Sequence, residues 1–148
     1  MTLRLKLAFA IYVAIGLLPL ASGVTYLVRS EFMPFHAEAA ALEWSQLSPG
    51  TQAVVLTLMK ATGGAYVAFA VSYFVILLLP FRRGIAWARY ALPALCLLLA
   101  TSSLNALNYL AGHSQATVPW VGPAASGILC VVAFVLSVAT EGSDGNVA

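Results

Sequence analysis

Four long apolar stretches restrict what this chain can fold into more than any other feature. They cover about residues 7–28, 51–81, 87–111 and 119–140. Each supplies the roughly 20 apolar residues that a helix needs to cross a hydrocarbon core of about 30 Å. We therefore predict an all-α fold, an integral membrane four-helix bundle that forms a single domain over residues 1–148.

The composition agrees with a membrane environment. Hydrophobic residues make up 61% of the 148 residues and charged residues only 8%, whereas a soluble domain carries about 25% charged residues. The net charge of +2 comes from few, scattered groups, so we expect no nucleic-acid binding. Cys96 and Cys130 lie in apolar stretches, where a free cysteine acts as a small hydrophobe. The sequence has no zinc-protease, P-loop or dinucleotide motif, so we expect no cofactor and no metal ion.

The first stretch has two interpretations. Arg4 and Lys6 precede it and "ASG" at 21–23 resembles a cleavage site, which together are typical of a signal peptide. However, the apolar run is longer than the roughly 7–15 residues of a signal-peptide core. We expect a retained helix.

The basic residues predict an orientation, because positive side chains near helix ends favour the cytoplasm. Five of the seven flank the N-terminus and the connection between the second and third stretches, whereas Arg29 lies near the other face. The five are Arg4, Lys6, Arg82, Arg83 and Arg89. We predict an inner-membrane protein with both termini in the cytoplasm and with residues 29–50 and 112–118 on the periplasmic side.

Residues 29–50 contain a candidate interfacial helix. Pro34 can begin a helix, "HAEAAALEW" favours one, and "SPG" at 48–50 is typical of the start of the next helix. We predict a short helix over about residues 35–47, with His36 and Glu43 on a common face. Its apolar residues would pack at the membrane boundary: Phe35, Leu42, Trp44 and Leu47.

Lys60 lies inside the second apolar stretch, where a charge at a helix centre costs roughly 2.5–3.5 kcal/mol. At a rise of 1.5 Å per residue it is about 33 Å from Arg82, which predicts a position at the outer interface. The same count from the cytoplasmic basic residues gives about 24–30 Å for other polar residues. They are Thr25, Tyr26, Asn105 and Asn108, so one polar layer is predicted.

The third stretch carries a polar stripe, because Thr101, Asn105 and Asn108 are spaced four and three residues apart. An amide has four hydrogen-bonding positions and lipid satisfies none of them, so the stripe should face protein. The expected partners are an ordered water or ligand, or residues across the bundle: Lys60, Thr57, Thr25 and Tyr26. Either these groups only join helices, at roughly 0.6 kcal/mol each, or they line a polar pocket open to the outer leaflet.

Small residues form faces on two of the predicted helices, around Gly63 and Gly64 and around Gly122 and Gly127. Such faces allow close helix approach, which favours packing within the bundle; the alternative is a dimer interface. His36 and His113 with nearby glutamates are the one conceivable metal set, but their spacing is not diagnostic. We expect these histidines to be solvated or hydrogen-bonded.

Four segments carry a resemblance: "FMPFH" at 32–36, "LSPGTQ" at 47–52, "LMKATGG" at 58–64 and "PFRRGIAWAR" at 80–89. Together they resemble motifs of a family of small uncharacterised bacterial integral membrane proteins with four helices. The resemblance covers about residues 5–138 and implies a bacterial membrane setting, but it brings no activity and no catalytic residue. The architecture is also similar to that of DoxX-like four-helix proteins, without a specific residue pattern.

The first functional hypothesis is a small inner-membrane protein that binds a lipid or small amphiphile in an outer-leaflet polar pocket, or that serves as an accessory subunit of a membrane complex. Its partners would be membrane lipids, a small amphiphilic ligand, and further copies of the chain or a larger complex. The candidate ligand-binding residues are Lys60, Asn105, Asn108, Thr25, Tyr26, His36 and Glu43.

Two other functions remain open. A membrane enzyme acting on a lipid or isoprenoid could use His36, Glu38 or Glu43 as general acid or base, but no sequence feature identifies a catalytic residue. A transporter needs polar groups through the whole depth of the membrane. Few are present in the cytoplasmic half, which makes transport the weakest of the three: Tyr12, Ser72, Tyr73 and Ser137.

Overall fold

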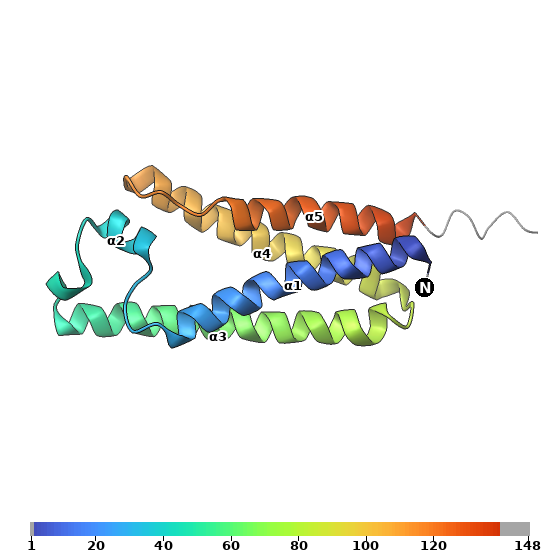
Figure 1. Ribbon diagram of the computed structural model, residues 1–148, viewed down its shortest axis with the longest axis horizontal. Coiled ribbons are helices and arrows are strands. Elements are labelled where there is room, and N and C mark those ends of the chain that lie inside the picture. The colour runs from blue at the N-terminus through green and yellow to red at the C-terminus, as the bar shows by residue number, and fades with distance from the viewer. Residues whose placement is uncertain (1, 140–148) are drawn as a thin grey trace, which may run out of the picture.

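The computed structural model describes residues 2–139, and these contain helices and connections but no strand (Figure 1). Four helices are long and apolar enough to cross a membrane. They are α1 (Leu3–Val28), α3 (Pro49–Ile76), α4 (Ala86–His113) and α5 (Val121–Val138). The prediction of an all-α, multi-pass membrane protein with a helical bundle is confirmed, and the predicted spans differ from the helices by a few residues at their ends.

The helix ends follow local chemistry. The Leu5 N–H donates to the Thr2 hydroxyl at the start of α1, and the Thr51 N–H donates to the Ser48 hydroxyl at the start of α3 (3.2 Å). Pro49 occupies the first turn of α3, where its missing N–H needs no partner. At its other end α3 continues into η2 (Leu77–Phe81), a π-helical turn that contains Pro80. Proline cannot donate to the α-helical ladder, so the regular helix ends in this turn.

The helix α1 lies in the middle of the bundle. It packs on α3 along one side and on α5 along the other, and α4 packs on α5. Figure 1 shows α1 crossing obliquely from the C-terminal end of α5, beside which α1 begins, to α3 at the other end. The helices α3 and α4 make little contact with each other. The bundle therefore consists of two helix pairs, α1 with α3 and α4 with α5, and the contact of α1 with α5 joins them.

Two glycines allow α1 and α3 to approach each other closely. Gly23 and Gly63 are buried, and a Cβ atom added to either would lie 2.8 Å from the carbonyl oxygen of the other. The backbones therefore touch at this crossing. Gly64 has no such neighbour within 4 Å, so only one of the two adjacent glycines is needed for the contact.

The core of the bundle lies toward the η2 end. Its largest fully buried side chains come from all four long helices and η2: Tyr12, Tyr73, Phe81, Leu77, Leu92, Cys130 and Ser137. The ring of Tyr12 meets that of Phe81 edge-on, with centroids 5.5 Å apart. Cys96 and Cys130 are free and buried, as predicted. Their thiols donate to the carbonyls of Ser126 and Pro93, each at 3.6 Å.

The segment between α1 and α3 differs from the predicted helix over residues 35–47. It contains α2 (Pro34–Ala40) and one 3-10 turn, η1 (Trp44–Gln46). Ala41 between them has φ 51°, a left-handed conformation that ends α2. Glu43 then begins η1, where its N–H donates to the Gln46 side chain (2.7 Å). The predicted short helix over residues 35–47 is therefore not confirmed as one continuous element, because the chain turns at Ala41 on its way back to α3, and this turn outweighs the helix preference of the alanine-rich sequence.

Candidate functional site

A groove of about 470 Å³ lies at the end of the bundle that holds α2. Its walls are the last turns of α1, the segment after α1, and the first turns of α3. The lining residues are Tyr26, Phe32, His36, Ala40, Leu47, Thr51, Val55, Leu58, Met59 and Thr62. We call this set the α2 groove. Its volume falls within the roughly 300–1,000 Å³ that is typical of small-molecule sites.

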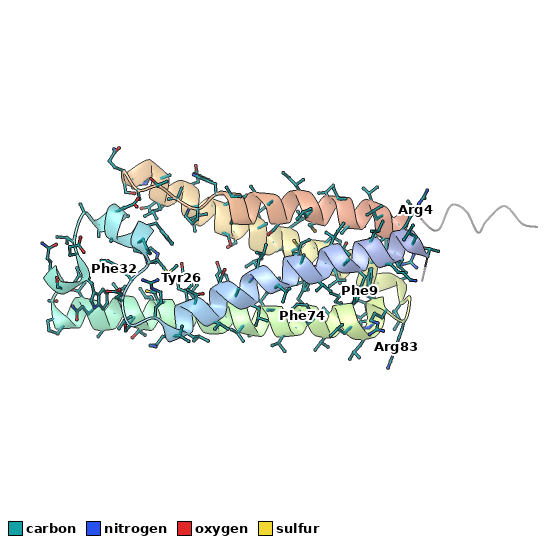
Figure 2. All side chains as sticks on the ribbon, viewed as in Figure 1. Arg4, Phe9, Tyr26, Phe32, Phe74 and Arg83 are labelled. Carbon is teal, nitrogen blue, oxygen red and sulfur yellow. The ribbon has the colours of Figure 1, made fainter. Side chains whose placement is uncertain are left out.

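Aromatic residues form the part of the α2 groove nearest to α2. The Tyr26 ring lies 6.3 Å from the His36 ring and 6.3 Å from the Tyr66 ring, edge-on to both. Phe32 is buried and meets Trp44 edge-on at 5.1 Å. Figure 2 shows Tyr26 and Phe32 in the region between α2 and α3. The contact between Tyr26 and His36 ties the segment to α1, and that between Phe32 and Trp44 joins two parts of the segment to each other.

The polar groups of the α2 groove are uncharged. Partial burial lowers the pKa of His36 below its usual value, which favours the neutral imidazole. A neutral imidazole has one N–H donor and one acceptor nitrogen, and a tyrosine hydroxyl can also do both. Thr51 and Thr62 add two hydroxyls. None of the lining residues in the described part of the chain carries a formal charge.

Lys60 lies outside the α2 groove and contacts the end of a helix. Its Nζ donates to the carbonyl oxygen of Leu27 at 3.0 Å. That carbonyl belongs to the last turn of α1, where no later backbone N–H is available to it. A cation at this end of a helix is also favoured by the helix dipole. Lys60 therefore lies beside the last turn of α1, and the contact joins α3 to α1.

The residues of the predicted polar layer form no hydrogen bonds with one another among the described residues. The Thr25 hydroxyl donates to Ala21 and the Thr57 hydroxyl donates to Ala53, each within its own helix at 2.8 Å. Asn105 and Asn108 are exposed and make no hydrogen bond with any described residue. The reason is that no residue of α4 from 101 to 113 is fully buried. This part of α4 is largely exposed, and its two amides form no hydrogen bond with Lys60 or Thr25.

Two polar contacts that connect the helix pairs were missed in the sequence analysis. The hydroxyls of Tyr66 on α3 and Ser103 on α4 lie 3.4 Å apart. The backbone N–H of Thr117 donates to the Glu38 carboxylate at 2.8 Å. The second contact joins α2 to the connection between α4 and α5, although the two residues are far apart in the sequence. Neither pair has a spacing signal that could have identified it.

Glu43 and His36 do not share a face, because the chain turns at Ala41 between them. Glu43 lies with Glu38 in a second, smaller cavity of about 290 Å³, lined by residues from α2 to η1. Of the seven candidate ligand-binding residues, the α2 groove therefore contains Tyr26 and His36. The other groove residues are mostly apolar, and an apolar side chain gives no signal in a chain that is apolar throughout.

The α2 groove can hold a small molecule, but its residues are poorly arranged for general acid–base catalysis. His36 makes no hydrogen bond with a carboxylate among the residues that the structure describes, and Glu38 and Glu43 are bonded to backbone amides. A general base needs a partner or substrate proton within about 3 Å. Within residues 2–139 there is also no group of three or more metal-ligating side chains.

Searches with the sequence and with the structure found no matching family model, no matching curated protein and no matching solved structure.

Proposed function

We propose that this protein is a small multi-pass protein of the bacterial inner membrane that holds a neutral amphiphile or lipid in the α2 groove. The observation that carries the proposal is a groove of about 470 Å³ whose walls are apolar and whose polar groups are uncharged. An apolar chain would lie along Val55, Leu58 and Met59. An uncharged head with a hydroxyl or carbonyl would meet Tyr26 and His36.

An anionic head group suits the α2 groove less well. Binding an anion in an apolar site requires a cation or several aligned donors, because an unpaired buried charge is costly. The nearest candidate from the sequence, Lys60, is bonded to the Leu27 carbonyl and does not line the groove. We therefore assign Lys60 to the contact between α3 and α1 rather than to the ligand, and the ligand we propose is neutral.

The charge distribution supports an orientation. Figure 2 shows Arg4 and Arg83 at the same end of the bundle, opposite α2. Lys6 and Arg82 are next to them in the sequence. Because positive residues near helix ends favour the cytoplasm, this end would be cytoplasmic, and α2 and its groove would lie at the periplasmic interface.

The experiment compares two tryptophan substitutions at adjacent positions. Val55 lines the α2 groove, whereas Val54 does not and is 60% exposed. The protein is purified in mild detergent, and the retained lipids and amphiphiles are extracted and quantified by mass spectrometry. Val55→Trp should fill the groove and lower occupancy about tenfold or more, equivalent to roughly 1.4 kcal/mol. Val54→Trp should retain the wild-type amount.

Lys60→Met tests whether Lys60 stabilises the contact between α3 and α1 instead of binding the ligand. It removes the hydrogen bond to Leu27, so the melting temperature in detergent should fall by the equivalent of roughly 0.5–1.5 kcal/mol. Ligand occupancy should fall only as far as the folded fraction does. The proposal fails if Val55→Trp melts normally and retains the same molecule at wild-type occupancy, or if Lys60→Met loses an anionic ligand while remaining folded.

A further inference from the structure

One side of α4 carries a regular row of exposed residues. They are Ala94, Leu98, Thr101, Asn105 and Asn108, and all five are exposed. Their spacings of four, three, four and three residues are those of the a and d positions of a heptad repeat. We call this row the α4 seam. Leu98 in its centre is 68% exposed, so nothing in the single chain covers it.

The depth of the α4 seam follows from two exposed tyrosines. Tyr90 and Tyr109 are 55% and 68% exposed, and aromatic residues of this kind gather at the two membrane interfaces. Their separation of 19 residues corresponds to about 28 Å, close to the roughly 30 Å of the hydrocarbon core. Asn105 is four residues, or about 6 Å, inside Tyr109. Its short side chain cannot extend that far to reach the head groups.

An exposed amide at this depth requires a partner. Lipid chains offer no hydrogen bond, so an unsatisfied polar group there costs several kcal/mol. Asn105 and Asn108 have no hydrogen-bond partner among the residues described. Thr101 differs, because its hydroxyl already donates to the Leu97 carbonyl at 2.7 Å. Asn105 is therefore the group on the seam that needs a contact from outside the chain, whereas Asn108, one residue from Tyr109, lies at the level of the interface.

We propose that the α4 seam is the interface between two copies of this chain. Both copies insert in the same orientation, so two α4 helices that meet side by side are parallel. A two-fold axis along the membrane normal then places each residue opposite its own counterpart at the same depth. Asn105 meets Asn105, and an amide can pair with another amide because it both donates and accepts. An asparagine at an a position also fixes register and oligomeric state.

The composition of the seam favours a second copy over a different protein. It carries no charged residue that would call for an opposite charge, and its polar groups are self-complementary. Ala94 is small enough to allow close approach below the asparagines, and Leu98 can pack on Leu98. The α2 groove does not include any residue of the seam, so this proposal is independent of the proposed ligand.

The first test compares two leucines at the same depth. Leu98 lies on the seam and Leu97 lies about 100° around the helix. Leu98→Cys should give an oxidative cross-link between copies in membranes, whereas Leu97→Cys should give at least tenfold less. Cys96 and Cys130 are buried, so the wild-type chain measures the background. Equal cross-linking of the two variants, none by either, or a Leu98→Cys adduct to a different protein would each overturn the proposal.

The second test removes the amides. Asn105→Leu combined with Asn108→Leu should raise the dimer dissociation constant in lipid nanodiscs or bilayers at least about tenfold, corresponding to roughly 1.4 kcal/mol for interhelical hydrogen bonds. The melting temperature of the monomer should not fall, because both side chains are exposed in the single chain. Asn105→Gln keeps an amide and should retain dimerisation. A double variant that dimerises like the wild type, or a wild type that is monomeric at every protein-to-lipid ratio, would contradict the assignment.

Discussion

At the scale of single residues, Gly23 and Gly63 set the distance between α1 and α3. Each would place a Cβ atom 2.8 Å from the other's carbonyl oxygen, and a backbone atom cannot move aside like a flexible side chain. Gly23→Ala should therefore separate the helices and lower stability by roughly 1–3 kcal/mol. Thermal unfolding in detergent, followed by circular dichroism, measures the change.

Gly64→Ala provides the matched control. Gly64 is in the same helix next to Gly63, but an added Cβ meets no atom within 4 Å. Alanine is favoured over glycine in a helix by roughly 0.5–1 kcal/mol, so this variant should melt at the wild-type temperature or above. If Gly23→Ala and Gly64→Ala behave alike, close backbone contact does not stabilise the α1–α3 pair.

Residue positions along a helix were more predictable than residue partners. A constant rise per residue placed Lys60 far along the bundle from Arg82, and in the structure Lys60 lies beside the end of α1. Its partner is a backbone carbonyl of Leu27, which no sequence pattern identifies. The small face around Gly63 was also recognisable. Gly23 was not singled out as the other side of the contact, because which helices are neighbours depends on the whole bundle.

At the scale of elements, we predict that the stability of α2 depends on the protonation state of His36. Burial lowers the pKa of His36 in the folded protein, whereas in an unfolded segment it is roughly 6.5. At pH values between the folded and the unfolded pKa of His36, the unfolded segment binds more protons than the folded one. The free energy of unfolding of α2 therefore decreases as the pH falls through about 6.5, and it becomes constant below the pKa of His36 in the folded protein. Hydrogen exchange of α2 should therefore be faster at pH 5.5 than at pH 7.5, after correction for intrinsic rates.

Two variants separate His36 from the other contact of α2. His36→Phe keeps an aromatic ring beside Tyr26 and Phe35 but cannot titrate, so the pH dependence should disappear. Glu38→Gln weakens the contact with the Thr117 N–H and should speed exchange at both pH values while preserving their difference. An unchanged pH dependence in His36→Phe would show that another group is responsible.

The four long helices were predictable because each apolar run exceeds the length needed to cross a membrane. The break at Ala41 was not. Alanine, leucine and glutamate all favour helix, so local sequence predicts continuation through residues 35–47. The left-handed residue at Ala41 is imposed by the need to return the chain to the start of α3. The π-helical turn at Leu77–Phe81 contains a proline that marks an irregularity without specifying its form.

At the scale of the whole molecule, the asymmetry of charge predicts which ends are accessible from the periplasm. Cysteine introduced at Gln115, between α4 and α5, should react with an impermeant thiol reagent added to intact cells. Cysteine at Gly145, which lies outside the described residues, should react only after the membrane is opened. The buried native thiols keep the background low. The opposite labelling pattern would place the α2 groove in the cytoplasm.

The arrangement of the helices relative to one another could not be derived from the sequence. Helices that are apolar on every side have no periodic pattern that indicates an inner face. The asparagine stripe of α4 was the best available indicator, and it was expected to face the bundle. In the single chain it faces outward, because the packing of α4 on α5 leaves that side uncovered. The periodicity of a sequence identifies a polar stripe on a helix. Which helix or molecule packs against that stripe depends on how all the helices pack and on how copies of the chain assemble.

The central place of α1 has a consequence for biosynthesis. The contact between Gly23 and Gly63 joins α1 to α3, which both precede α4 and α5 in the chain, so the α1–α3 pair can assemble while α4 and α5 are still being translated. The other side of α1 is covered by α5, which is made after α4. Until then that side of α1 stays open to lipid or to insertion factors. A stop codon between α4 and α5 would leave a nascent product with its first interface complete and its second one unprotected.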